Sequence, residues 1–334
     1  MYETHYGLTA KPFQLRPDPN FFYGSKGHKR AMAYLDYGVS QGEGFIVITG
    51  EVGAGKTTLV RNLFRKIESD KIYAVQIVNT HLDSDDILRM VASGFELPYA
   101  GVGKAELLTS IEELLRYIDK QGKRALLVVD EAQNLTPRAV EELRMLSNFQ
   151  TAEKSLLQTF LLGQPEFRKT LMSPGMQQLR QRVIATYHLG PMDVPETRTY
   201  IEHRLATVGW NGNPSFDAEA FDAIHRHTGG IPRRINALCD RLFLMGYLEE
   251  LTHFTEADVE TVAGDIAQEF TSGETEHEPE MAPMTQTMHA SYDNISIEHM
   301  DARISGLERS VMSMLDAMKA MLGTRRQGGS EKQL

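Results

Sequence analysis

Apolar residues along positions 1–190 follow two alternating patterns. Short, almost continuously apolar runs predict buried strands, and segments with apolar residues three or four apart predict helices. The predicted strands cover residues 45–49, 72–79, 125–131, 156–164 and 183–189. The predicted helices cover residues 26–40, 58–64, 83–95, 104–121, 136–148 and 178–182. Because strands alternate with helices, we expect an α/β fold: a three-layer αβα core in which helices cover both faces of a parallel sheet.

The strand pattern stops near Pro191, and a small all-α domain is predicted over residues 191–270. Residues 271–296 are polar, acidic and rich in Glu, Met, Pro and Thr, which is typical of a flexible linker. Apolar residues recur three and four apart over residues 297–323, which predicts an amphipathic or coiled-coil helix before a disordered tail, 324–334. A surface helix folded back on the protein is the alternative. The predicted helices of the all-α domain cover 196–208, 217–228, 231–248 and 255–270.

One strand-to-helix junction contains a phosphate-binding motif. Residues 50–57 fit G-x-x-x-x-G-K-[ST], with an apolar strand before them and a helical segment after them. Glycines let such a turn wrap closely, so that backbone N–H groups and the positive end of the helix face phosphate oxygens. Lys56 is expected to reach the β- and γ-phosphates, and the Thr57 hydroxyl to hold Mg²⁺. The predicted nucleotide-binding residues are Gly50, Glu51, Val52, Gly53, Ala54, Gly55, Lys56, Thr57, Thr58 and Asp130.

A second nucleotide signature ends another predicted strand. Asp130 and Glu131 close the apolar run 125–131, where two carboxylates need a compensating charge. Mg²⁺ with a water supplies that charge, so we expect Asp130 to join Thr57 in the metal shell. Glu131 is expected to orient and polarise the attacking water. Together the two signatures predict an enzyme that hydrolyses ATP to ADP and phosphate, with Mg²⁺ as its cofactor.

Residues 1–30 differ from the core domain that follows at 31–190. They combine aromatic residues with Pro and Gly, which predicts an extended strap and not a helix. Because the strap precedes the phosphate-binding motif, part of it is expected to cover the nucleotide base. The alternative is that its aromatic side chains plug the edge of the core. Ser25, near its end, is a candidate N-cap of the helix 26–40.

Composition and charge limit the setting of the protein. Hydrophobic residues make up 41% and charged residues 24%, and no apolar run approaches the ~20 residues of a membrane helix, so no transmembrane segment is expected. No secretory signal is visible and Cys239 is the only cysteine, so we expect a reducing, cytoplasmic location. The net charge is −10, yet residues 1–241 carry only +1. Nucleic-acid binding is therefore not excluded, but no basic block favours it.

The two signatures and the helical domain after them resemble an AAA+ ATPase, with the helical domain as its lid. A closer resemblance is carried by the strings Tyr6-Gly7-Leu8, Lys11-Pro12-Phe13, Pro17-Asp18-Pro19, Ser25-Lys26-Gly27-His28 and residues 42–51, 161–167 and 229–236. Over about residues 1–268, these strings are similar to the general-secretion-pathway protein A (ExeA-like) family. Within it they most resemble the secretion ATPase that accompanies exosortase/PEP-CTERM and exopolysaccharide loci. The family's secretion-pathway member continues into a membrane span and a peptidoglycan-binding domain, which residues 271–334 do not resemble.

The resemblance implies roles for further residues. Gln164 matches sensor 1, a polar side chain that contacts the γ-phosphate or the lytic water, and Arg233 matches sensor 2, the lid arginine that closes on ATP. Arg182 matches an arginine finger that reaches the nucleotide of a neighbouring subunit, with Arg180 as the competing candidate. Asn79 is a candidate tether for the catalytic glutamate. The structural alternatives are surface ion pairs for Arg180 and Arg182 and strand-end caps for the two amides.

The resemblance also implies a functional setting. We expect a homo-oligomeric ring, a hexamer, that drives or regulates secretion or PEP-CTERM-linked exopolysaccharide export. Residues 297–323 are expected to contact a protein of the membrane export machinery, which would place the chain at the periphery of the inner membrane. An ATP-gated DNA-binding adaptor, like the transposition ATPases that share this core, is the alternative. A third reading is an ATP-dependent scaffold that recruits a membrane partner through its C-terminal helix.

Overall fold

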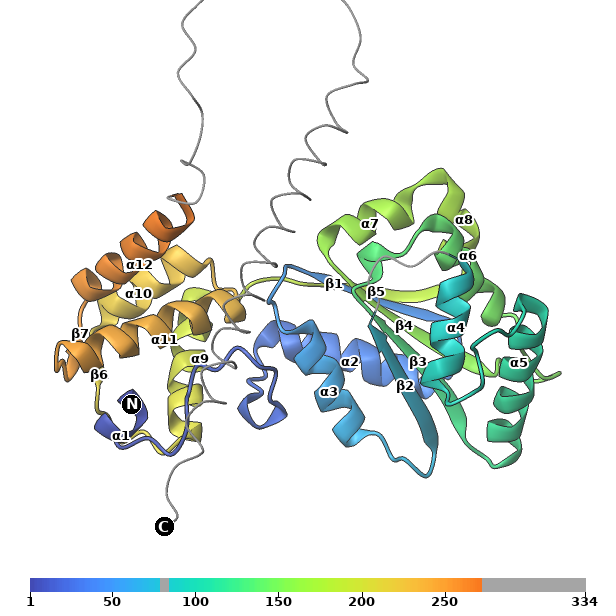
Figure 1. Cartoon of the computed structure of the whole chain (residues 1–334), viewed down its shortest axis with the longest axis horizontal. Coiled ribbons are helices and arrows are strands. Elements are labelled where there is room, and N and C mark those ends of the chain that lie inside the picture. Colours follow the sequence, from blue (N-terminus) through green and yellow to red (C-terminus); the bar gives the residue numbers. More distant parts are fainter. Residues whose placement is uncertain (79–83, 272–334) are drawn as a thin grey trace, which may run out of the picture. The chain divides into compact units, whose positions relative to one another are not determined.

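A parallel five-stranded sheet forms the centre of the core domain (Figure 1). The computed structural model describes residues 1–78 and 84–271. The order of strands across the sheet is β2-β3-β4-β1-β5, and all neighbouring pairs run parallel. Every connection between consecutive strands passes through at least one helix, which confirms the predicted αβα fold. The strands are β1 (Phe45–Gly50), β2 (Ile72–Val78), β3 (Arg124–Asp130), β4 (Leu157–Gly163) and β5 (Val183–Leu189).

Helices cover both faces of this sheet, because successive strand side chains point to opposite sides. On β1, Ile46 and Ile48 pack with helices α2 and α3, whereas Val47 packs with helices α4 to α8. The apolar pattern does not predict α7, because only Phe167 and Leu171 of that helix are buried. The helices are α2 (Lys26–Gln41), α3 (Lys56–Lys66), α4 (Ser84–Gly94), α5 (Lys104–Lys120), α6 (Pro137–Leu146), α7 (Pro165–Met172) and α8 (Gln177–Arg180).

Local signals determine how helix α2 begins and how it packs. The Ser25 hydroxyl accepts a hydrogen bond from the His28 N–H at 3.2 Å, which confirms the predicted N-cap. Farther along the helix, a Cβ on Gly38 would lie 2.5 Å from Ile46 Cγ1 of β1. The absence of a side chain at Gly38 therefore allows α2 to approach the sheet closely.

The lid consists of four helices and a small two-stranded sheet. Helix α9 begins with a capping box, in which Asp193 accepts from the Glu196 N–H at 2.8 Å and Glu196 reaches back to the Asp193 N–H. The strands β6 (Ser215–Phe216) and β7 (His253–Phe254) pair in parallel, which corrects the expectation that strands end at Pro191. Each of these strands has only two residues, which is too short for an apolar pattern to predict it. The lid helices are α9 (Val194–Thr207), α10 (Ala218–Thr228), α11 (Pro232–Leu248) and α12 (Glu256–Thr271).

The strap packs against the lid and is not extended throughout. A one-turn helix, α1 (Tyr2–His5), and a 3-10 turn, η1 (Pro19–Phe21), correct the expectation that this segment contains no helix. The Tyr6 and Phe13 rings each lie 5.4 Å from the Phe243 ring of α11. Aromatic side chains of the strap thus complete the apolar core of the lid, and tertiary packing stabilises a helix too short to form by itself.

Some predictions concern residues outside the described ranges: Asn79 as a tether, the linker after Thr271, the helix 297–323 and the tail. The boundaries drawn between strap, core and lid also stay predictions, although all three segments belong to one compact unit. Among the described helices, none is both long enough and apolar enough to span a membrane.

Candidate nucleotide-binding site

The phosphate-binding motif forms a loop between β1 and α3. Gly53 and Gly55 have φ angles of 83° and 99°, in the left-handed region that favours glycine. The loop also has little room, because a Cβ on Gly53 would lie 2.3 Å from Arg233 Cβ. Helix α3 begins at Lys56, so the free N–H groups of its first turn stand at the end of the loop. The backbone therefore has the form of an anion-binding cradle.

Lys56 is almost fully buried within this loop, with 6% of its surface exposed. Its Nζ donates to the carbonyl oxygens of Gly50 at 2.7 Å and Glu51 at 3.1 Å. Burial lowers the pKa of Lys56, and the nearby carboxylates of Glu131 and Asp130 oppose that shift. These hydrogen bonds hold the Lys56 ammonium group in the loop, and Lys56 lines a cavity next to it.

Thr57 and Asp130 lie side by side at the base of the loop. The Thr57 hydroxyl donates to Asp130 Oδ2 at 2.8 Å, and the Glu131 N–H donates to Asp130 Oδ1 at 3.0 Å. Asp130 is 2% exposed, and burial raises the pKa of its carboxyl group. Within residues 1–78 and 84–271, no three His, Cys, Asp or Glu side chains form a metal-ligand cluster. One hydroxyl and one buried carboxylate fit a divalent cation that takes its other ligands from phosphate and water.

Glu131 follows β3 in a left-handed conformation with φ 55°, and its side chain lines the cavity. Gln133 holds it in place: Gln133 Nε2 donates to Glu131 Oε2 at 2.6 Å. The other end of the same amide, Gln133 Oε1, accepts the backbone N–H of Gln164 at 2.9 Å. Gln133 therefore links the ends of β3 and β4. It is not among the predicted site residues; an amide two positions after the Asp-Glu pair is the signal that could have found it.

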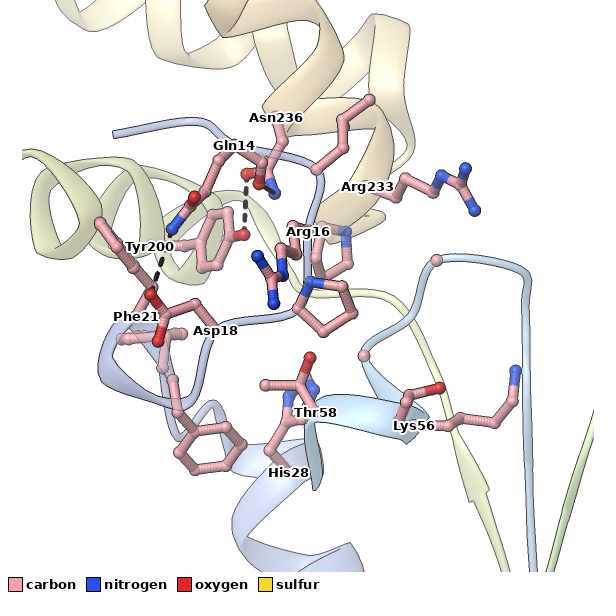
Figure 2. A pocket seen from close by; sticks show the side chains of 18 of the residues that line it. Gln14, Arg16, Asp18, Phe21, His28, Lys56, Thr58, Tyr200, Arg233 and Asn236 are labelled. Atoms are coloured by element: carbon pink, nitrogen blue, oxygen red, sulfur yellow. Dashed lines mark hydrogen bonds between the residues drawn. The ribbon is translucent and has the colours of Figure 1, made fainter. Parts of the chain in front are cut away.

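Gln164 and Arg233 line the same cavity from opposite domains. Gln164 follows β4 and is the N-cap residue of α7, although its side chain makes no cap hydrogen bond to that helix. The Arg233 N–H donates to the Gly53 carbonyl at 3.2 Å, so the lid helix α11 touches the phosphate loop. Figure 2 shows the Arg233 side chain extending from α11 on the same side of the view as Lys56.

The cavity has a volume of about 190 Å³, and the strap forms much of its wall. In Figure 2, Phe21 and Tyr200 lie on the side away from Lys56, with Thr58 between. The structure thus brings the phosphate loop, Glu131, sensor candidates and strap together. The strap residues that line the cavity are Gln14, Leu15, Arg16, Pro17, Asp18, Phe21, Phe22 and Tyr23.

Arg204 of the lid fastens the strap at this cavity. Its Nε donates to the Pro12 carbonyl at 2.6 Å, and its Nη1 donates to the Tyr200 hydroxyl at 2.9 Å. The guanidinium also lies 4.8 Å from the centre of the Phe21 ring. Arg204 is 6% exposed. No local signal could have identified it, because its strap partners are far away in the sequence.

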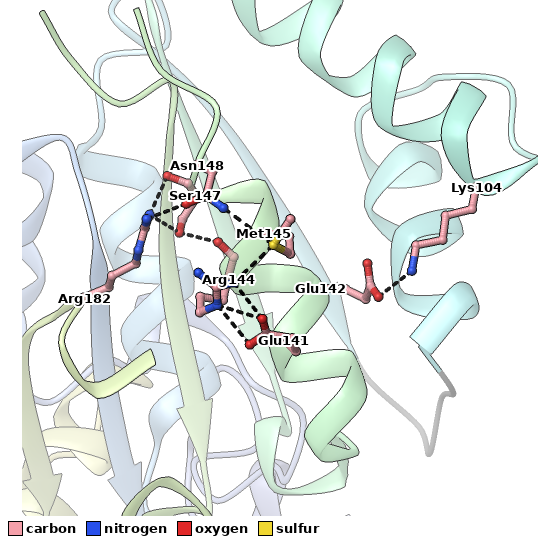
Figure 3. A network of polar contacts seen from close by, with 8 residues as sticks. All are labelled: Lys104, Glu141, Glu142, Arg144, Met145, Ser147, Asn148 and Arg182. Carbon is pink, nitrogen blue, oxygen red and sulfur yellow. Dashed lines mark hydrogen bonds and ion pairs between the residues drawn. The ribbon is translucent and has the colours of Figure 1, made fainter. Parts of the chain in front are cut away.

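The two candidate arginine fingers lie away from the cavity. The Arg182 carbonyl accepts the N–H of Phe45, the first residue of β1, so roughly 20 Å of strand separates Arg182 from the loop. Its guanidinium donates to the Ser147 carbonyl at 2.9 Å, to Ser147 Oγ at 2.8 Å and to Asn148 Oδ1 (Figure 3).

Arg180 is bound differently. Its Nη1 donates to the carbonyl oxygens of Leu171 and Ser173, at 2.6 and 2.7 Å, where α7 ends. Within the part of the chain that the structure describes, Arg180 and Arg182 form no ion pair, so the surface-ion-pair alternative does not describe them.

Comparisons with known proteins agree with this geometry. A family model described as an AAA domain matches residues 39–171. General secretion pathway protein A of Aeromonas hydrophila is 38% identical over 269 residues, which is 80% of this chain and 49% of that protein. The chain thus spans about half the length of this relative.

Solved structures show the same fold at low sequence identity. The Aeropyrum pernix ORC2 protein matches with a TM-score of 0.59 and 16% identity, over 76% of this chain and 71% of that one. Cdc6p from Pyrobaculum aerophilum matches with a TM-score of 0.58 and 17% identity, over 75% and 71%.

The sheet order, the phosphate loop and the matching AAA model define a P-loop fold of the AAA type, and such a domain implies nucleotide binding with a divalent metal. In sequence, most of the described chain is related to general secretion pathway protein A.

Proposed function

We propose that this chain binds ATP with Mg²⁺ and hydrolyses it, as a member of the general-secretion-pathway protein A family. The observation that carries the proposal is the arrangement of Lys56, Thr57 and Glu131 around one cavity, with Asp130 hydrogen-bonded beneath Thr57 at 2.8 Å. A cation, a metal-binding pair and a general base are the parts that phosphoryl transfer to water requires.

Each of these residues has a defined part in the reaction. Lys56 and the loop N–H groups bind the β- and γ-phosphates, while Thr57 and Asp130 would hold Mg²⁺, which when bound neutralises charge on the phosphates. Glu131 orients a water molecule and accepts its proton. Gln164 contacts the γ-phosphate or that water, and Arg233 closes on the phosphates from the lid.

The base of the nucleotide lies between the strap and the lid in this proposal. The cavity extends from Lys56 to Phe21 and Tyr200, and the strap side is lined by three aromatic rings, the Gln14 amide and the charged side chains of Arg16 and Asp18. Aromatic rings and hydrogen-bonding amides suit a flat, polar-edged base. The strap thus both completes the core of the lid and covers the base.

A ring of identical subunits completes the proposed site. Arg182 lies at the amino ends of the strands, whereas the phosphate loop lies at their carboxyl ends. Arg182 is therefore placed to contact the nucleotide of a neighbouring chain and not the nucleotide of its own chain. Arg180 is the competing candidate, and the guanidinium groups of both residues donate to backbone carbonyl oxygens of their own chain. A hexamer is the size that we propose.

The proposed setting is export, because the relative is a general secretion pathway protein. We place the chain in the cytoplasm at the inner membrane, linked to PEP-CTERM and exopolysaccharide export, with residues 297–323 contacting the machinery. These residues lie outside the described ranges. No feature of the described chain favours the DNA-binding alternative, since the likeness to the ORC2 and Cdc6p structures shows the fold alone.

Two variants test ATP hydrolysis in the full-length chain. Glu131→Gln should bind ATP as tightly as wild type but hydrolyse it at least about a hundredfold more slowly, because the base is lost. Lys56→Ala should lose ATP binding. Calorimetry and phosphate release measure the two properties.

Glu166→Gln is the matched control: it removes an exposed carboxylate near Lys56 that does not line the cavity, and it should leave both properties unchanged. Wild-type turnover by Glu131→Gln would show that Glu131 is not the base.

A further inference from the structure

Four residues at the start of α2, Ser25, Lys26, Gly27 and His28, have no part in the proposed function. They form segment 25–28, which lies near the end of the strap and contacts both the phosphate loop and the lid. Ser25 and His28 are nearly buried, with 3% and 6% of their surfaces exposed. Buried polar side chains have specific partners, so the hydrogen bonds of this segment indicate what it holds.

His28 is bonded on both ring nitrogens. Its Nε2 lies 3.1 Å from the Ala54 carbonyl oxygen, and its Nδ1 lies 2.7 Å from Ser25 Oγ. A carbonyl oxygen can only accept, so Nε2 bears the hydrogen and donates it to Ala54. Burial lowers the pKa of His28, which favours the neutral ring and makes Nδ1 an acceptor for the Ser25 hydroxyl.

The bond to Ala54 determines the orientation of one peptide group in the phosphate loop. The Ala54 carbonyl and the Gly55 N–H belong to the same trans peptide, so they point in opposite directions. With its carbonyl held by His28, this peptide directs the Gly55 N–H away from the ring. The packing is tight, because a Cβ on Gly55 would lie 2.7 Å from His28 Nε2. Gly55 also lines the cavity.

The other end of the segment is attached to the lid. The Lys26 N–H donates to Glu196 Oε1 at 2.6 Å, and Lys26 Nζ pairs with Asp193 at 3.0 Å. Asp193 and Glu196 are the two residues of the capping box that begins α9. A single residue, Gly27, therefore separates the residue that contacts the lid from the residue that contacts the phosphate loop.

We propose that His28 is a positioning residue for the phosphate loop: it aims the Gly55 N–H at a nucleotide phosphate, and segment 25–28 ties this arrangement to lid helix α9. The effect on nucleotide affinity rests on the proposed function. The effect on the loop itself does not, because the hydrogen bond to Ala54 joins two groups of the chain itself.

The test compares His28→Ala with His28→Gln in the full-length chain. A glutamine amide can replace the Nε2 donor, whereas alanine leaves the Ala54 carbonyl without its partner. Without nucleotide, amide exchange of residues 53–56 should be about tenfold faster in His28→Ala and near wild type in His28→Gln. The dissociation constant for ATP should rise about tenfold in the alanine variant only.

If His28→Ala does not fold, His28→Asn takes its place, because the shorter amide can reach Ser25 but not Ala54. His227→Gln, on the lid surface, is the matched control and should change neither property. Two variants test the link between segment 25–28 and the lid. Glu196→Ala removes the acceptor of the Lys26 N–H and should also speed amide exchange of the loop. Glu196→Gln keeps an acceptor oxygen and should not.

The outcomes separate the two proposals. If the wild-type protein bound no ATP, the proposed function would be overturned. Amide exchange of residues 53–56 would still test the positioning role of His28. Equal exchange in His28→Ala, or His28→Asn, and His28→Gln would overturn the positioning role. Unchanged exchange in Glu196→Ala would overturn the tie to the lid.

Discussion

At the scale of single residues, each buried polar group around the phosphate loop has a specific partner. Asp130 accepts from Thr57 and from the Glu131 N–H, and Lys56 donates to two loop carbonyls. Such partners are required because burying a charge without compensation is costly. Glu131 is different: its left-handed backbone is unusual for a non-glycine residue, and its carboxylate accepts a hydrogen bond from the Gln133 amide. The geometry of the candidate base therefore depends on Gln133.

Gln133→Leu tests that dependence. The change keeps the size of the side chain but removes both hydrogen bonds, so kcat for ATP hydrolysis should fall about tenfold or more while KM changes little. Gln133 does not line the cavity, which is why binding should be preserved. Steady-state phosphate release gives both constants. Gln178→Leu, an exposed position on α8, is the control, and a rise in KM with unchanged kcat would contradict a positioning role.

At the scale of elements, the strap and the lid form one wall of the cavity. Tyr6 and Phe13 complete the apolar core of the lid, and Arg204 of α9 holds the strap backbone at Pro12. Helix α11 contacts the phosphate loop through the Arg233 N–H. A change in α9 that releases the strap should therefore affect both the stability of the lid and the binding of a nucleotide base.

Arg204→Met tests the coupling between strap and lid. The variant keeps the apolar stem but removes buried hydrogen bonds to Pro12 and Tyr200, so the free energy of unfolding should fall by about 2–3 kcal/mol and ATP affinity should weaken. Urea denaturation and calorimetry measure the two effects. Arg198→Met on the same helix breaks an exposed pair with Glu202 and a contact with the Phe221 ring, 5.1 Å away, but no contact with the strap. Each of these interactions is worth about 0–1 kcal/mol, so this variant serves as control. Equal losses in both variants would argue against the strap attachment.

At the scale of the whole molecule, the candidate catalytic residues lie at opposite ends of the parallel strands. Lys56 and Glu131 stand where strands end, and Arg182 stands where β5 begins. Ser147 and Asn148 orient the Arg182 guanidinium beside the end of α6. In an assembly of several chains, the phosphate loop of one chain and Arg182 of another could meet at one nucleotide.

Mixing two inactive variants tests this arrangement. Arg182→Ala and Lys56→Ala should each lack ATP hydrolysis, but mixed rings should recover part of it, because an intact loop then meets an intact arginine from another chain. Turnover measured over a range of mixing ratios detects the recovery. Asn148→Ala is the control, because it removes a hydrogen-bond partner of Arg182 at the end of α6 but keeps Arg182 itself. Its loss of ATP hydrolysis should be smaller than that of Arg182→Ala. No recovery at any ratio would count against Arg182 acting in trans.

The sequence by itself determined the strands, most helices, the phosphate loop and the Asp130-Glu131 pair, because each depends on residues that are adjacent or one helical turn apart. The helix of the strap, α7 and the β6-β7 pair escaped prediction, since short elements form only when packing stabilises them. Only the tertiary structure decided what holds the loop and the base: Gln133 on Glu131, His28 on Ala54 and Arg204 on the strap. Those contacts join side chains to backbone or side-chain partners that the fold, and no local pattern, brings together.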